Sequence, residues 1–155
     1  MKPTAFRPLA TALTAAIIFA GPAFSQSAAV RVPSALPVDE AVARMSQAIE
    51  GAGARVFTTV NYAEGARSVG GALRPTTVII FGGPQIGAAV FEESQTIGLY
   101  LPLRVLAYED AAGEAWLLYD DPADAAAEHG IPEDHPAILN MKAALERVTS
   151  VGSGS

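Results

Sequence analysis

The fold of this chain is decided by TTVIIFGGPQIG at residues 76–87, followed by GLYLPLRVLAYED at 98–110 and EAWLLYDD at 114–121. The first six residues, TTVIIF, lack polar alternation, which is typical of a strand buried on both faces. The glycines and proline after them end that strand, and a short helix is expected from Gly87 to Ser94. The two later stretches are rich in β-branched, aliphatic and aromatic residues, which favour strands.

These last two strands predict a hairpin. Leu103 to Glu109 and Glu114 to Asp120 flank Ala111-Ala112-Gly113, a three-residue loop with glycine where left-handed backbone is needed. This loop sets a register, and the expected cross-strand pairs are Asp110 with Glu114, Tyr108 with Trp116, Leu106 with Leu118, and Arg104 with Asp120. The opposite face of the hairpin would then carry Val105, Ala107, Leu117 and Tyr119.

The rest of the chain supplies helices and two further strands. Before the hairpin we expect a short edge strand at 28–32 ended by Pro33 and Pro37, and then a helix at 38–50. A strand at 55–60 and a short helix to about residue 69, capped by Asn61, follow. After it we expect a helix at 123–128 and a final helix starting at Pro136, whose apolar stripe is Ile138, Met141, Leu145 and Val148. The closing residues 151–155 are expected to form a flexible tail.

The predicted fold class is therefore α+β, with a single domain at residues 26–150. Its twisted, mixed β-sheet of about five strands packs against helices, and the element order is roughly β-α-β-α-β-α-β-β-α-α.

Residues 1–25 have the pattern of a secretory signal peptide. Lys2 and Arg7 precede an apolar run from Leu9 to Ala20, and Ala23-Phe24-Ser25 resembles a small-x-small cleavage site. That run is about twelve residues, shorter than the roughly 20 that a membrane span needs. We therefore expect a periplasmic or secreted protein with no membrane span after cleavage.

Composition excludes several kinds of partner and site. Without Lys2 and Arg7 the chain has 8 basic and 16 acidic side chains, a formal charge of about −8. This balance argues against nucleic acid, which needs basic patches. The absence of cysteine excludes disulfides, thiol nucleophiles and thiolate metal sites. Lys142 is the one lysine after the signal segment, and no serine lies in a G-x-S-x-G motif, so covalent catalysis is poorly supported.

The motifs FGGPQIG, LPLRVLAYED and AWLLYDDP, followed by AAEHGI and a final helix, resemble the domain of unknown function 302 family. The resemblance covers about Val30 to Val148 in order and without large gaps. It implies a compact α+β domain that tends to form a dimer, and it implies no established activity. One departure is Tyr62, which stands in a segment where family members often carry histidine.

The candidate ligand site combines the glycine-proline loop with the hairpin. A loop between a strand and a helix can present backbone N–H groups to an anion, although the same glycines also permit a tight turn. Arg104 could hold a carboxylate, or it could pair with Asp120 across the strands. Tyrosines could line a pocket, although aromatic residues in strands more often belong to a core or a dimer interface. The predicted ligand-binding residues are Tyr62, Gly82, Pro84, Gly87, Arg104, Tyr108 and Asp120.

Two alternatives use other residues. His129 and His135 are the only histidines and have acidic neighbours, so they are the candidate metal ligands, although their H-x5-H spacing has no regular metal-binding geometry. Carboxylates acting with Arg104 and Tyr62 are the candidate enzymatic arrangement. The sequence identifies no cofactor and no catalytic residue. The leading hypothesis is an exported dimer that binds a small ligand, apolar or anionic, in a cleft between the Gly82 to Gly87 loop and the hairpin.

Overall fold

The computed structural model describes residues 29–155, so the expected signal peptide at 1–25 lies outside the described residues. The elements are β1 (Val30–Ser34), α1 (Val38–Gly51), β2 (Arg55–Asn61), α2 (Tyr62–Ser68), β3 (Thr76–Gly82), α3 (Pro84–Glu93), η1 (Gln95–Leu99, a 3₁₀ helix), β4 (Leu103–Glu109), β5 (Ala115–Tyr119), α4 (Pro122–Glu128) and α5 (Pro136–Ser153). This order confirms the predicted one, with η1 added between α3 and β4.

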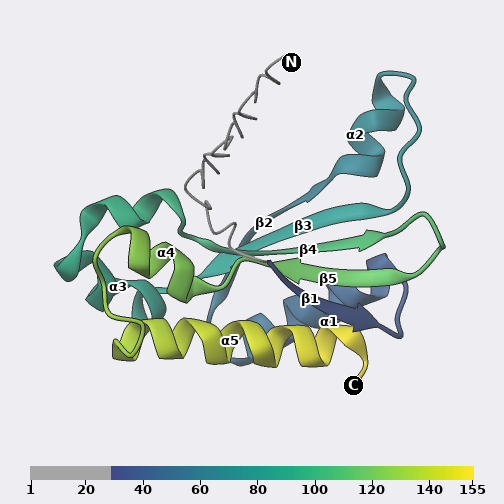
Figure 1. Cartoon of the computed structure of the whole chain (residues 1–155). Coiled ribbons are helices and arrows are strands. Elements are labelled where there is room, and N and C mark those ends of the chain that lie inside the picture. Colours follow the sequence, from purple (N-terminus) through teal and green to yellow (C-terminus); the bar gives the residue numbers. More distant parts are fainter. Residues whose placement is uncertain (1–28) are drawn as a thin grey trace, which may run out of the picture.

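The five strands form one open sheet in the order β1-β5-β4-β3-β2 (Figure 1). Every neighbouring pair in it is antiparallel. The predicted α+β class is confirmed, but the expectation of a mixed sheet is wrong. It fails because each connection between neighbouring strands reverses the chain, including the one through α3 and η1, which returns β4 antiparallel to β3.

Helices α1 and α5 pack against each other and cover one face of the sheet (Figure 1). The predicted stripe of α5 is buried along its length, and α1 buries a matching stripe at helical spacing. Between them and the sheet lie the most deeply buried large side chains, among them Phe81, Met45, Ile79, Leu117 and Met141. The opposite face of the sheet carries Val60, Val78, Leu106 and Leu118 in one row across four strands.

The hairpin register is confirmed. Leu106 pairs with Leu118, and Tyr108 pairs with Trp116. The Asp110 backbone N–H donates to the Glu114 carbonyl at 2.9 Å, which closes the loop. Gly113 has φ +83°, the left-handed conformation that the loop needed. A short local loop therefore suffices to set this register.

Both edge strands of the sheet contain an irregularity. The expected edge position of β1 is confirmed. Pro33 lies within β1 and does not end it, contrary to expectation, because one side of an edge strand needs no N–H donors. Strand β2, at the other edge, has a register shift between Val56 and Thr58, which places Phe57 in a bulge.

The expected flexible tail is wrong, because α5 continues through Ser153. The Ala35 N–H donates to the Ser153 carbonyl at 2.9 Å, and Gly152 lies directly against Met45 of α1. Tertiary packing thus overrides a glycine- and serine-rich composition that would otherwise disfavour a helix. The left-handed Gly154, at φ +79°, ends the helix.

Candidate functional site

A cavity of about 540 Å³ lies at the end of the sheet where β2 and β4 begin and β3 ends. Helix α3 forms its remaining wall. The side chains around it are almost all apolar, and the lining residues are Arg55, Phe57, Gly82, Gly83, Pro84, Gly87, Ala88, Phe91, Leu101, Pro102 and Leu103. Its volume is within the range of about 300–1,000 Å³ that small-molecule pockets occupy.

Glycines keep this cavity open. A Cβ atom added at Gly82 would lie 3.4 Å from Phe57 Cε2, and one added at Gly87 would lie 3.5 Å from Phe91 Cε2. Both are ordinary contact distances, so the backbone does not require glycine for space at its own position. Longer side chains at either residue would instead extend toward these phenylalanines and fill the volume between them.

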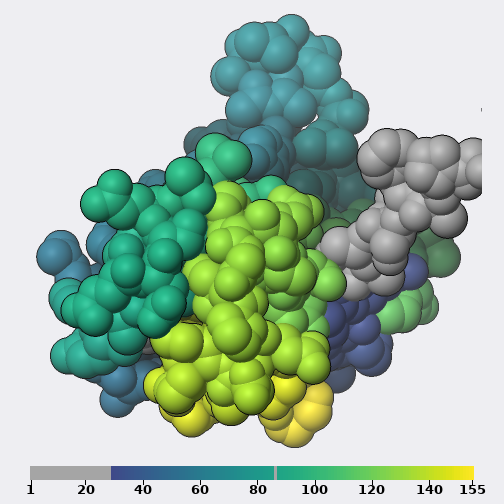
Figure 2. Space-filling view, turned by 60° about the vertical axis from the view of Figure 1, so that its left-hand side comes forward, coloured from purple at the N-terminus to yellow at the C-terminus, as the bar shows by residue number. Residues whose placement is uncertain are grey.

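Helix α3 starts earlier than expected, at Pro84. Proline suits this first helical position because it has no N–H to leave unpaired. Gly83 is the N-cap and contributes no side-chain cap, and the first turn holds no acidic residue. The start of α3 thus borders the cavity without a side-chain cap. Figure 2 shows the surface of this end, where α3 and η1 lie beside α4.

Arg104 and Asp120 lie at a separate and much smaller cavity of about 40 Å³, which also touches Tyr100 and Asp121. That volume holds only a few water molecules. Arg104 Nη2 lies 3.7 Å from Asp120 Oδ2, and the two side chains are 49% and 65% exposed. The expected cross-strand ion pair is therefore confirmed, with a stabilising effect of about 0–1 kcal/mol. Leu101 and Leu103 line both cavities. The structure therefore has two separate cavities where the sequence predicted one cleft.

The structure does not bring Tyr62 close to Arg104 and Asp120. Tyr62 opens α2, which rises away from the sheet (Figure 1) and leaves that side chain 48% exposed. In the sheet register Thr58 pairs with Ile80, and Ile80 pairs with Arg104. Strand spacings then place Tyr62 roughly 16 Å from Arg104. An enzymatic site that uses both residues therefore has no support in this arrangement.

Tyr108 belongs to a cluster at the hairpin end of the sheet. The Arg31 guanidinium stacks 3.6 Å from the centroid of Trp116 and 5.7 Å from that of Tyr108. Arg31 Nη2 also lies 3.3 Å from Asp110 Oδ2, which accepts a hydrogen bond from Trp116 Nε1 at 2.8 Å. These contacts hold the edge strand β1 against the hairpin. Tyr108 therefore has a structural role there, as a partner of Arg31.

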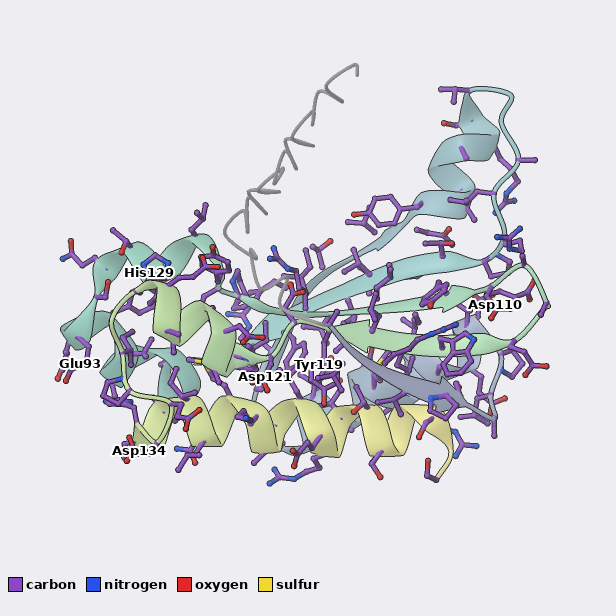
Figure 3. The ribbon with its side chains drawn as sticks, viewed as in Figure 1. Glu93, Asp110, Tyr119, Asp121, His129 and Asp134 are labelled. Carbon is purple, nitrogen blue, oxygen red and sulfur yellow. The ribbon has the colours of Figure 1, made fainter. Side chains whose placement is uncertain are left out.

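Asp110, labelled at the hairpin tip in Figure 3, organises the loop. Its Oδ1 atom accepts hydrogen bonds from the backbone N–H groups of Ala112 and Glu114 at 2.9 and 3.1 Å. The hydrogen bond from the Glu114 N–H lowers the pKa of this carboxyl, and the Trp116 and Ala112 donors and Arg31 act in the same direction. The folded state therefore favours the ionised form of Asp110.

Because the folded pKa of Asp110 is lowered, its stabilising effect is present above the unfolded pKa of about 3.9 and is lost as the pH falls through the folded value. We expect Asp110→Asn to lower the thermal midpoint by a few degrees at pH 7, and the difference from wild type to close below about pH 4. Thermal unfolding between pH 3 and 7 measures this, with Glu92→Gln, an exposed acid on α3, as the control. A difference that persists unchanged to pH 3 would contradict the assignment.

The two histidines cap different helices. His129 follows α4 as its C-cap, and its Nδ1 atom lies 2.7 Å from Thr96 Oγ1. His135 is the N-cap of α5, where its Nδ1 atom accepts the Ala137 N–H at 3.2 Å. Among residues 29–155, no group of three or more His, Cys, Asp or Glu side chains is placed to hold a metal ion.

The surroundings of His129 include Tyr100, whose ring packs edge-on at 5.3 Å between centroids. The Tyr100 hydroxyl donates to Glu128 Oε2. This hydrogen bond raises the pKa of Tyr100, so the phenol favours its neutral form. Within the described part of the chain, His129 Nε2 is buried without a hydrogen-bond partner. The cluster holds η1 against α4, as Figure 3 shows near the His129 label.

Three of the predicted ligand residues, Gly82, Pro84 and Gly87, line the large cavity. Sequence reasoning missed its other walls, notably Arg55, Phe57 and Phe91. Arg55 pairs with Gly82 across β2 and β3. A prediction that these two strands pair antiparallel would have placed Arg55 beside the glycine-proline loop. The sequence pattern did not predict the bulge that changes the direction of the Phe57 side chain.

Known proteins resemble this chain in fold and in part of their sequence. A crystal structure of an uncharacterized conserved protein DUF302 from Bacillus stearothermophilus matches with a TM-score of 0.64 and 18% identity, covering 81% of this chain and 95% of the other. At that identity the similarity shows the fold alone.

Curated relatives include proteins from Brucella suis biovar 1 and Brucella abortus biovar 1, each named "Fluoride-specific ion channel FluC 1". Each is 40% identical over 130 residues, which cover 83% of this chain but 51% and 48% of the respective relatives. The chain thus spans about half the length of the curated relatives it matches. Within residues 29–155, no helix is long and apolar enough to cross a membrane.

The family model "Domain of unknown function DUF302" matches residues 30–150, which include all five strands and nearly all of α5. The resemblance that the FGGPQIG, LPLRVLAYED and AWLLYDDP motifs carry is therefore confirmed, and the chain belongs to the DUF302 family.

Proposed function

We propose that this domain is a small-ligand binding module and that the cavity between α3 and the starts of β2 and β4 is its site. The observation that carries the proposal is a cavity of about 540 Å³ with almost entirely apolar walls. Small-molecule sites have this character, since burial of apolar ligand surface supplies affinity and a few polar groups set orientation.

The exposure of two aromatic walls supports the same proposal. Phe57 is 53% exposed and Phe91 is 41% exposed, and both line the cavity. Large apolar side chains that gather around a hollow mark binding surfaces more often than isolated ones do. A bound apolar molecule would remove part of both rings from water and would gain about 25 cal/mol for each Å² buried.

Filling the cavity tests this proposal. We expect Gly87→Leu to reduce binding of the uncharged fluorescent probe N-phenyl-1-naphthylamine by about tenfold or more, because the leucine side chain occupies the ligand's volume. Leucine also favours helix over glycine, so α3 should keep its stability. Fluorescence titration measures the affinity, and urea unfolding verifies that the fold is kept.

Gly65→Leu is the matched control for this titration. It makes the same substitution in helix α2, where an added Cβ has no atom within 4 Å. The control is expected to bind the probe as wild type does. Equal probe affinity in the wild type and Gly87→Leu proteins, with both folded, would refute the cavity as the site.

We also propose that the protein is exported and acts as a dimer. The signal-like segment at residues 1–25 supports export, and the resemblance to the family supports the dimer. The sheet face that α1 and α5 do not cover offers an apolar row for self-association, in which Val60 is 40% exposed. Native mass spectrometry of protein from an exporting host tests both proposals, with an expected dimer whose subunits lack the signal residues.

A charged residue placed in the apolar row of the sheet tests directly whether that face forms the dimer interface. Val60→Glu is expected to shift the assembly to monomer, because an isolated carboxylate in an apolar interface is costly. Val69→Glu is the control, since Val69 is 85% exposed and lies beyond α2. A monomeric wild type, or a subunit mass that includes Met1, would refute the dimer or the export respectively.

Channel activity is not proposed for this chain. The name of the Brucella relatives describes proteins about twice as long as the matched region. A metal-handling role is not proposed either, since both histidines act as helix caps in residues 29–155 and no third ligand joins them there.

A further inference from the structure

Arg55 is the one charged side chain among the described residues that line the large cavity. It begins β2 and pairs with Gly82, two residues before the start of α3. Arg55 therefore lies at the rim of the cavity, beside the loop that leads into the helix. No carboxylate lines this cavity among residues 29–155.

Within the same residues, Arg55 forms no ion pair, whereas Arg31, Arg44 and Arg104 each lie within 3.7 Å of a carboxylate oxygen. The first turn of α3 has no acidic residue, so nothing there offsets the partial positive charge of its N-terminus. The guanidinium and the helix start therefore add potential of the same sign at one point of the rim.

The chain as a whole has the opposite sign. Its formal net charge is −6, so its long-range field repels anions. An anion that binds the cavity must therefore gain any preference over a neutral ligand from contacts at the rim, since the apolar walls serve both ligands alike. The local charge thus distinguishes between ligands that the apolar walls would accept equally.

We propose that the cavity binds an amphipathic organic monoanion, in which one carboxylate pairs with Arg55 and an apolar chain or ring fills the space between Phe57 and Phe91. A planar guanidinium can donate two parallel hydrogen bonds to a carboxylate, which fixes the orientation of the ligand. The inference rests on the proposed ligand-binding function and adds the chemical class of the ligand.

The experiment compares decanoate, 1-decanol and decylammonium, which share an apolar chain and differ in the charge of the head. Each displaces N-phenyl-1-naphthylamine from the full-length mature protein at pH 7.5 and low salt, below the concentrations at which the ligands form micelles. We expect decanoate to bind about ten- to a hundredfold more tightly than 1-decanol, because a hydrogen bond to a charged group contributes about 1.5–3 kcal/mol. Decylammonium is expected to bind most weakly.

Variants at Arg55 assign the preference to one side chain. Arg55→Ala is expected to lower the affinity for decanoate to that for 1-decanol, and Arg55→Lys is expected to retain part of the preference through a point charge. Arg67→Ala, an exposed arginine on α2, is the control that keeps the full preference. Equal affinity of wild type for decanoate and 1-decanol, or a preference that survives Arg55→Ala, would overturn the anionic class.

That failure is distinguishable from failure of the proposed function. If 1-decanol and the naphthylamine bind the cavity and respond to Gly87→Leu, ligand binding stands and only the anionic class is overturned. If none of the probes binds, and Gly87→Leu behaves as wild type does, the proposed function and this inference are overturned together.

Discussion

Phe81→Ala is expected to lower the free energy of unfolding by about 3–5 kcal/mol, whereas Phe57→Ala is expected to lower it by less than about 1 kcal/mol. Phe81 is fully buried, while Phe57 is 53% exposed at the cavity. The two phenylalanines lie on neighbouring strands, since Val56, next to Phe57, pairs with Phe81. The same atoms are removed in both variants, so the difference reports burial alone.

The two phenylalanine variants should also differ in ligand binding, and here Phe57→Ala should have the larger effect. Loss of the Phe57 ring removes a cavity wall and should weaken N-phenyl-1-naphthylamine binding, because the probe loses apolar contact area. Urea unfolding gives the stabilities, and probe titration of the folded variants gives the affinities. Similar stability losses for the two variants would contradict the division between core and cavity described here.

Gly152→Ala is expected to destabilise the protein by about 1–3 kcal/mol, although alanine normally favours a helix over glycine. An added Cβ would overlap Met45 Cγ and would lie 3.1 Å from Met45 Sδ and 3.3 Å from Leu117 Cδ1. Met45 is fully buried, so its side chain has little room to move. Gly51→Ala is the control, because an added Cβ there has no atom within 4 Å.

A double-mutant cycle identifies the contact. Met45→Ala alone is expected to lower stability by about 2–5 kcal/mol through the cavity it leaves. In the double variant the alanine at residue 152 no longer overlaps a neighbour and fills part of that cavity. The combined loss should therefore be smaller than the sum of the single losses by about 1 kcal/mol or more. A Gly152→Ala protein as stable as wild type would show that the last turn of α5 is not packed against α1.

Local signals in the sequence predicted the elements of this fold better than their arrangement. The Ala111-Ala112-Gly113 loop was enough to set the hairpin register, because a short loop leaves few ways to pair its flanking strands. Asn61 capped α2 as predicted, since its side chain accepts the Glu64 N–H at 2.9 Å. These interactions join residues that are close in the sequence.

Two of the errors share a cause, which is that each depended on residues far apart in the sequence. Whether the edge strand ends at Pro33 or continues through it depends on pairing with β5, and Pro33 pairs with Trp116. Whether residues 151–153 are flexible depends on the packing of Gly152 on α1, about a hundred residues earlier. Neither the strand pairing nor the helix packing can be predicted from composition alone.

The candidate site was predicted in part for the same reason. The glycine-proline loop was identified because its pattern is local, and three of its residues line the cavity. Arg55 and Phe57 were missed because they reach the loop only through the pairing of β2 with β3. Arg104 and Asp120 were correctly paired, but the leucines at the start of β4 separate them from the large cavity.

The irregular edge strands bear on how this protein avoids aggregation. An open sheet has two edges, and an unprotected edge can recruit strands from other molecules and grow into fibrils. Here Pro33 removes a hydrogen-bond donor from the β1 edge, and the bulge at Phe57 breaks the regular spacing of donors and acceptors along the β2 edge. Both edges of the sheet thus resist the addition of strands from other molecules.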